Sequence, residues 1–331
     1  MRIKTLFFGS PEFGLTILKS LISLDYIEIV GIVTQPDKEF GRKKVLKSTP
    51  VKEFIKQSHP EIKVFEPVKL KAVALDILEE AKPELIVVAA YGKILPDSII
   101  NYPKYKCLNV HGSLLPILRG AVPVQMAILK GFKETGVSIQ IMKQEMDEGD
   151  ILFSKSIIIE DRDTSKTLMD KMAVLGSEII KSNLTDYIEG KVTPIKQDST
   201  KATYCFLTDL SYEKALIDWG KDSTEIDRLI RTFNPEPIAY TNGLVVKLMD
   251  KFVCNIKIDG KVKIYESSLL ESSDNLEIPQ NLEIHTGEGI VLNGKLLIKT
   301  SGNFICILKL QLEGKNIVSS SDFINGLKNR V

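Results

Sequence analysis

The 331-residue chain has very little histidine, cysteine and tryptophan, with three, four and one of each. The cysteines form no C-x-x-C pair and lie in mostly apolar sequence, which favours reduced, buried thiols over a disulfide framework. No apolar run reaches the roughly 18 residues that a membrane span needs. The first residues break into Gly and Pro too soon for a signal peptide. These absences predict a cytoplasmic protein that does not contact a membrane.

An excess of charge of one sign is also missing. The chain carries 44 Lys and Arg against 43 Asp and Glu, a formal net charge of +1. Such a balance creates no long-range field toward nucleic acid or anionic lipid, although a local basic patch remains open. No cluster of His, Cys and carboxylates has zinc-site spacing, so no metal is expected. The hydrophobic share of 44% is ordinary for a soluble globular protein, and the length predicts two domains.

The first half of the chain alternates β-rich runs with helical patterns. Strands are expected at residues 3–9, 27–34, 84–91 and 106–111, with helical patterns between them. This alternation favours a Rossmann-like α/β domain with a mostly parallel sheet. Residues 135–142 and 150–159 are typical of two antiparallel strands, and residues 165–184 of one long helix.

The pattern of the sequence changes after about residue 190. A polar, irregular stretch predicts a linker, and from residue 237 short strands alternate with turns every 8–12 residues, as in a small OB-like β-barrel. We therefore expect an α/β domain over residues 1–190, a linker over 191–208 and a barrel domain over 209–331.

The stretch "LNVHGSLLP", residues 108–116, holds one of the three histidines. Ligands of such sheets bind beyond the carboxyl ends of the strands. Asn109 and His111 share one face of the predicted strand and can polarise a carbonyl oxygen or hold an oxyanion. A turn with Asp147, Glu148 and Asp150 offers a carboxylate that can fix the tautomer of His111. A purely structural histidine is the alternative.

The sequence around these residues resembles that of a known protein family. "LNVHGSLLPILRGAVPVQMAILKG", followed by "TGVSIQIMKQEMDEGDIL", resembles the 10-formyltetrahydrofolate-dependent formyltransferases in its Asn-x-His, "SLLP" and Asp-x-Gly motifs. "FFGSPEFG" and "VVAAYGKILP" fit the same family. "TQPDKEFGRKKVLKSTPVKEFIKQ" and "LIDWGKDSTEIDRLIRTFNPEPIAYT" resemble its methionyl-tRNA formyltransferase branch. The resemblance extends from about residue 3 to residue 328.

The resemblance implies a reaction in which the α-amino group of methionine on initiator tRNA attacks the formyl carbon of 10-formyltetrahydrofolate. Asn109 and His111 would stabilise the oxyanion, while Asp147 would orient His111 and help to move the amine proton. No covalent intermediate and no stable protein partner are implied. The folate would contact residues on two loops, namely Ala89, Tyr91, Gly92, Ile94, Ser113, Leu114, Leu115 and Pro116.

Residues 37–52 form a basic segment that follows a predicted strand. Arg42, Lys43, Lys44 and Lys47 can neutralise phosphates of a tRNA acceptor stem. A solvated charged loop is the alternative, and the resemblance favours tRNA. The barrel domain would dock the tRNA, although from residue 201 onward it has 16 Lys and Arg against 17 Asp and Glu.

Other functions remain open at this point. A related folate-dependent formyltransferase or hydrolase could act on another amine or on water, and the basic segment and second domain favour tRNA over these. A non-enzymatic tRNA-binding protein would not need Asn109, His111 and Asp147. A dinucleotide-dependent dehydrogenase is disfavoured because the G-x-G-x-x-G pattern is missing.

Overall fold

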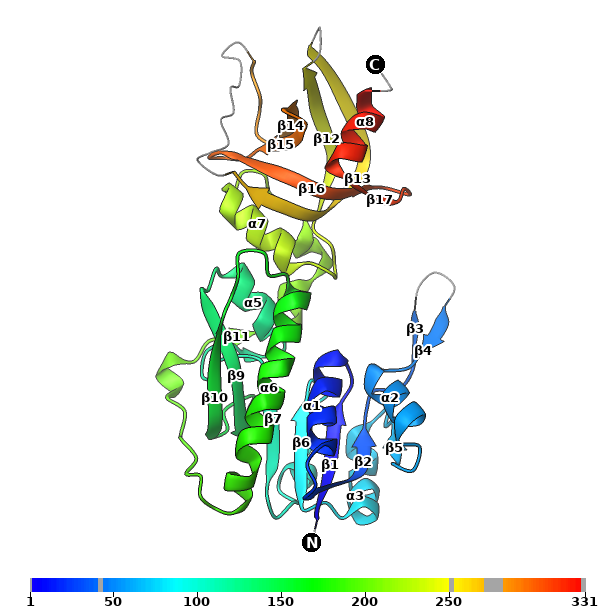
Figure 1. Cartoon of the computed structure of the whole chain (residues 1–331), viewed down its shortest axis with the longest axis vertical. Coiled ribbons are helices and arrows are strands. Elements are labelled where there is room, and N and C mark those ends of the chain that lie inside the picture. Colours follow the sequence, from blue (N-terminus) through cyan, green and yellow to red (C-terminus); the bar gives the residue numbers. More distant parts are fainter. Residues whose placement is uncertain (1, 41–43, 250–252, 271–281, 329–331) are drawn as a thin grey trace. The chain divides into compact units, whose positions relative to one another are not determined.

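The computed structural model describes residues 2–40, 44–249, 253–270 and 282–328 (Figure 1). Packing divides the chain into two compact units. The first is built from residues 1–124, 133–159 and 167–206, and the second from residues 125–132, 160–166 and 207–331.

A seven-stranded sheet forms the centre of the first unit, in the order β10-β9-β7-β6-β1-β2-β5. The strands β7, β6, β1, β2 and β5 are parallel, while β9 pairs antiparallel with both β7 and β10. This confirms the predicted Rossmann-like, mostly parallel sheet. The strands are β1 (Ile3–Gly9), β2 (Ile27–Val33), β5 (Val64–Phe65), β6 (Leu85–Ala89), β7 (Cys107–His111), β9 (Glu134–Ile141) and β10 (Ile151–Ile158).

Helices cover both faces of this sheet because its strands are apolar on both sides. The helices α3 and α4 pack on the face that carries Leu6, Phe8, Ile86 and Val88. On the other face α6 packs against α1 and β7, so closely that a Cβ built on Gly176 would lie 3.0 Å from Ile17 and 3.1 Å from Val110 (Figure 1). The helices are α1 (Glu12–Ile22), α2 (Pro50–Ser58), α3 (Leu70–Ala81), α4 (Asp97–Ile100) and α6 (Ser165–Ile188).

The order of the strands reverses at β1, since β2 and β5 lie on one side of it and β6 and β7 on the other. In open α/β sheets the ligand binds at such a switch point, beyond the carboxyl ends of the strands. The loops after β6 and β7 therefore lie at the edge of the sheet where a ligand is expected.

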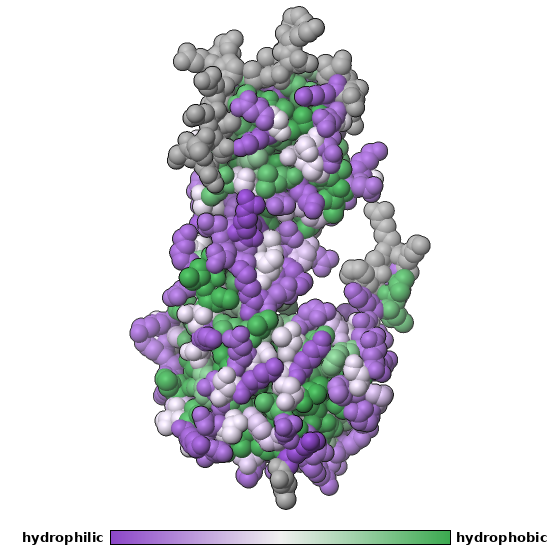
Figure 2. Space-filling view, in the orientation of Figure 1, coloured by the Kyte–Doolittle hydropathy of each residue, from purple (hydrophilic) through white to green (hydrophobic). Residues whose placement is uncertain are grey.

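The basic segment that follows β2 is a hairpin rather than an irregular loop. Its strands are β3 (Lys38–Phe40) and β4 (Val45–Lys47), and α2 begins three residues later. Val45 and Leu46 are 63% and 68% exposed, and Figure 2 shows the resulting hydrophobic surface on the hairpin. Arg42 and Lys43 lie outside the described residues.

The second unit contains the predicted barrel. The strands pair in the closed ring β12-β14-β15-β16-β13, in which β13 returns to β12, and this confirms a five-stranded barrel. Its interior is filled by apolar side chains such as Val246, Val262, Leu296 and Ile305. The elements are α7 (Ser223–Thr232), β12 (Tyr240–Met249), β13 (Val253–Leu269), β14 (Glu288–Leu292), β15 (Lys295–Lys299), β16 (Phe304–Leu312), β17 (Ile317–Ser319) and α8 (Ser320–Lys328).

The segment predicted as a linker contacts the first unit up to residue 206. Ile195 forms a β-bridge with Ile151. The short strand β11 (Tyr204–Cys205) pairs with β8 (Arg119–Gly120), and α5 (Pro123–Leu129) follows β8. Within the described part of the chain, no helix is both long and apolar enough to cross a membrane.

Candidate active site

Four polar side chains face one another across β7 and β9. Asn109 pairs with Gln140, and His111 pairs with Ser138, in the antiparallel register of the two strands. Residues directly opposite on such strands have their Cβ atoms about 4.5–5.5 Å apart. The sheet therefore brings a histidine, two amides and a hydroxyl to one place near the carboxyl end of β7.

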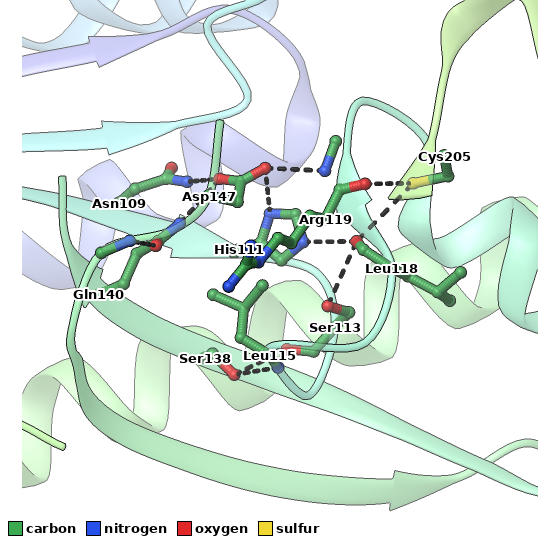
Figure 3. A network of polar contacts seen from close by, with 12 residues as sticks. Asn109, His111, Ser113, Leu115, Leu118, Arg119, Ser138, Gln140, Asp147 and Cys205 are labelled. Atoms are coloured by element: carbon green, nitrogen blue, oxygen red, sulfur yellow. Dashed lines mark hydrogen bonds and ion pairs between the residues drawn. The ribbon is translucent and has the colours of Figure 1, made fainter. Parts of the chain in front are cut away.

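The carboxylate of Asp147 lies at the centre of this group (Figure 3). Its Oδ1 accepts hydrogen bonds from Gln140 Nε2 at 2.7 Å and from Asn109 Nδ2 at 3.2 Å. Its Oδ2 accepts one from the Gly120 backbone N–H at 2.8 Å. Three donors on one carboxylate fix its position. The structure thus brings together the three residues that the sequence predicted as catalytic.

His111 is 5% exposed and has an acceptor beside each ring nitrogen. Its Nε2 lies 2.9 Å from the carbonyl oxygen of Leu118, which can only accept, so this nitrogen carries a proton. Its Nδ1 lies 3.6 Å from Asp147 Oδ2. The ring is therefore held between a backbone carbonyl and the carboxylate of Asp147.

Gly120 allows the close approach that delivers the third donor to Asp147. Its φ is +114°, and a Cβ built on it would lie 2.1 Å from the carbonyl oxygen of Cys205. The pairing of β8 with β11 fixes this geometry. No other residue type fits here without moving the backbone N–H away from Asp147.

The first predicted folate loop follows β6. Ala89 is buried at the end of the strand, whereas Gly92 and Ile94 are exposed, Ile94 by 85%. The ring of Tyr91 points into the core, where it meets Phe8 edge to face at 5.2 Å. Burial raises the pKa of Tyr91 to about 12. A ligand contact from residue 91 would therefore use its backbone.

The second predicted folate loop follows β7 and is fixed by two serines. Ser138 Oγ donates to the carbonyl of Ser113 at 2.8 Å and accepts from the N–H of Leu115 at 3.1 Å. The hydroxyl of Ser113 donates to the carbonyl of Ile117. Leu115 is buried, while Leu114 and Pro116 are partly exposed.

The predicted tRNA residues are exposed where the structure describes them. Lys44 pairs with Glu39 at 3.3 Å, and Lys47 lies at the end of β4. Lys52 differs, since its side chain is only 6% exposed and its Nζ lies 2.7 Å from Asp37 and 2.6 Å from Glu66. Lys52 is thus a buried ion-pair residue and not a phosphate ligand.

Two glutamines of this site were not predicted from the sequence. Gln140 binds Asp147 directly, and Gln197 donates to the backbone carbonyls of Asp147 and Gly149. A signal exists for Gln140, because Ser138 and Gln140 are polar and alternate with apolar residues in the second half of β9. Gln197 stands in a polar stretch and offers no such signal. Within the described ranges, no group of three or more His, Cys, Asp and Glu could hold a metal ion.

The fold and the site together match one class of enzymes. The family model "Formyl transferase" matches residues 1–184, and the model "Formyl transferase, C-terminal domain" matches residues 209–328. Solved structures with the same fold include WlaRD, a sugar 3N-formyl transferase, with 20% identity, a TM-score of 0.63 and coverage of 96% of this chain and 100% of that one. HypX from Aquifex aeolicus has a TM-score of 0.61 at 16% identity, covering 100% of this chain and 48% of that one.

Curated relatives show to which formyl transferases the chain is similar in sequence over nearly its full length. The methionyl-tRNA formyltransferase of Bacillus subtilis is 37% identical over 328 residues, covering 98% of this chain and 94% of its own. The enzyme of the same name from Caldanaerobacter subterraneus is 38% identical over 327 residues, covering 98% and 97%. The chain belongs to the methionyl-tRNA formyltransferases of the formyl transferase family.

Proposed function

We propose that the chain transfers the formyl group of 10-formyltetrahydrofolate to the α-amino group of methionyl initiator tRNA, giving formylmethionyl-tRNA. The observation that carries the proposal is the cluster of Asn109, His111 and Asp147 at the ligand edge of the sheet. The full-length similarity to curated methionyl-tRNA formyltransferases supports the acceptor.

Asn109 is the proposed donor to the formyl oxygen. Its amide nitrogen gives one hydrogen to Asp147 and retains a second N–H for the oxyanion that forms when the amine attacks. We propose that His111, whose ring lies between the carbonyl of Leu118 and Asp147, also stabilises this oxyanion. We assign Asp147 to orienting His111 and to moving the amine proton through water.

The enzyme needs no covalent intermediate, because a neutral amine is already a nucleophile. Positioning the two substrates can supply about 7–11 kcal/mol of the reduction in the activation barrier, independently of any acid or base. We propose that the folate lies along the loops after β6 and β7, contacting Ala89, Tyr91, Gly92, Ile94, Ser113, Leu114, Leu115 and Pro116.

We propose that the hairpin contacts the acceptor end of the tRNA through Lys44 and Lys47. The predicted contacts of Arg42 and Lys43 belong to the same proposal but lie outside the described residues. The barrel would dock the body of the tRNA. The four cysteines form no disulfide and three of them are buried, which supports a reducing cytoplasm as the proposed location.

The test is formyl transfer by the purified chain from 10-formyltetrahydrofolate to initiator Met-tRNA, with free methionine and water as competing acceptors. We expect formylmethionyl-tRNA as the main product. Folate turnover without formylated tRNA would assign the same chemistry to another acceptor. No turnover with an intact fold would contradict the proposal.

A further inference from the structure

The turn that carries Asp147 has an unusual backbone. Asp147 has a φ of +54°, in the left-handed region that costs a non-glycine residue about 1 kcal/mol or more. Two residues later, a Cβ on Gly149 would lie 1.6 Å from the carbonyl of Ile141. Such a conformation persists only where its surroundings hold it.

Gln197, from a distant part of the sequence, stabilises this conformation of the turn. Its side chain is buried, with 8% of the residue exposed. Its Nε2 donates to the carbonyl oxygen of Asp147 at 2.8 Å and to that of Gly149 at 2.6 Å. Its Oε1 accepts from Arg119 Nε at 3.1 Å and Nη2 at 2.9 Å. All four hydrogen-bonding positions of the amide are therefore used.

Arg119 connects Gln197 to a second residue of the turn, Glu148. It is fully buried, and its Nη1 lies 2.8 Å from Glu148 Oε1. The next residue, Gly120, gives its N–H to Asp147 Oδ2. The backbone of the turn and the carboxylate of Asp147 are thus held by one connected network (Figure 3 shows the part around Arg119 and Asp147).

We propose that Gln197 is a positioning residue for the formyl transfer. It fixes the left-handed conformation of Asp147 and thereby aims the carboxylate at His111 and Gly120. Only the expected change in kcat rests on the proposed function; the structural role of Gln197 does not. A role in the reaction is thereby assigned to one residue of the segment 191–208, which the sequence alone marks as a linker.

The test compares Gln197→Glu with the native chain. Glutamate retains the length of the side chain and an acceptor for Arg119, but it cannot donate to the two carbonyls. We expect kcat for formyl transfer to fall about 10- to 100-fold, because small displacements of reacting groups cost this much. KM for the folate and for Met-tRNA should stay within about twofold, since no substrate contact is removed.

Two controls separate positioning from a loss of structure. Ser199→Ala removes only a 3.4 Å contact to Arg119 and should leave kcat within about twofold. Gln197→Met, which is similar in size and carries no charge, should lower kcat as Gln197→Glu does. In the background of Asp147→Asn, Gln197→Glu should have little further effect, because coupled residues are not additive.

Hydrogen exchange of the Gly120 amide gives a readout that needs no substrate. We expect exchange at least about tenfold faster in folded Gln197→Glu than in the native chain, while amides at the centre of β7 keep their rates. Unchanged exchange, unchanged kcat, or an equal loss of kcat in the Asp147→Asn background would overturn the inference. If the native chain formylates no tRNA, the proposed function fails, and the exchange rates still decide whether Gln197 holds Asp147.

Discussion

Asn109 lies directly opposite Gln140 on the neighbouring antiparallel strand, and both side-chain amides donate to the same oxygen of Asp147. A single carboxylate thus fixes the orientation of the amide that we assign to the formyl oxygen. The relationship predicts that Gln140 matters for the reaction although it contacts no substrate.

Gln140→Met should lower both the stability and the rate. The variant removes a donor to Asp147 and the acceptor of the Gly149 N–H, which leaves buried polar groups without partners at a cost of about 1–3 kcal/mol. Urea unfolding measures that loss, and single-turnover assays should show a fall of about tenfold or more in the rate of transfer. Ser138→Ala is the comparison, because it loosens the loop after β7 without touching Asp147 and should weaken folate binding more than it lowers the rate at saturating folate. An unchanged rate in Gln140→Met would contradict the assignment.

Lys52→Met should weaken the use of tRNA more than the chemical step. Lys52 lies on α2, which follows β4, and its Nζ donates to Asp37, just before β3, and to Glu66. These ion pairs therefore connect the two ends of the hairpin at its base. We expect KM for Met-tRNA to rise roughly threefold to tenfold with kcat nearly unchanged, which corresponds to about 0.7–1.4 kcal/mol of binding. Lys56→Met, on the same helix, should leave KM unchanged. A fall in kcat without a change in KM would show that the base of the hairpin does not act in binding.

The ion pairs of Lys52 with Asp37 and Glu66 make the stability of the protein depend on pH. The hydrogen bond from Lys52 lowers the pKa of Asp37 below 3.8. Burial alone would lower the pKa of Lys52, but the carboxylates of Asp37 and Glu66 outweigh it and raise this pKa above 10.5. The contribution of Asp37 to stability is therefore present above pH 3.8 and lost as the pH falls further, whereas that of Lys52 is lost only above pH 10.5. Urea midpoints of the native chain and Lys52→Met should differ at pH 7 and converge below pH 3.8.

Tyr91→Phe should leave the protein equally stable or slightly more stable. The hydroxyl of Tyr91 is buried, and no hydrogen-bond partner for it exists among the described residues. Removing an unsatisfied polar group relieves its desolvation cost. Tyr187→Phe is the control, since its hydroxyl donates to the carbonyl of Tyr105 at 3.2 Å and its loss should cost about 0.5–1.5 kcal/mol. Thermal unfolding distinguishes the two, and a marked loss in Tyr91→Phe would reveal a partner for its hydroxyl.

Gly120→Ala should disrupt the site far more than a typical glycine substitution. The added Cβ collides with the carbonyl of Cys205, so we expect a loss of more than about 3 kcal/mol of folding free energy together with a large fall in kcat. Gly314→Ala has a φ of +72° but open space around it, and should cost only about 1 kcal/mol with activity intact. Similar stabilities of the two variants would contradict the close approach of β8 and β11.

Much of this fold follows from patterns that neighbouring residues create. The apolar runs at Ile3–Gly9 and Leu85–Ala89 predict buried strands, and alternation in Glu134–Ile141 predicts an antiparallel one. Asn109 and His111 are predicted together because side chains two residues apart in a strand share a face. These local rules need no knowledge of distant contacts.

The remaining features depend on contacts between distant segments. Gln197 binds Asp147 across 50 positions, and Arg119 binds Gln197 across 78. In sequence Gln197 looks like any polar residue of a linker. Lys52 looks like one more cation of a basic run, and only its position between Asp37 and Glu66 shows that its charge is already neutralised.

The most direct test of the account is the single-turnover rate of formyl transfer to initiator Met-tRNA by Asp147→Asn, with both substrates saturating. Asparagine has nearly the same shape but carries an NH2 group in place of one carboxylate oxygen, so it cannot accept all three hydrogen bonds that Asp147 accepts. The account predicts a rate lower by about 10²–10³, with the affinities for folate and tRNA unchanged. A rate within about threefold of the native chain would contradict the central role of the Asp147 carboxylate.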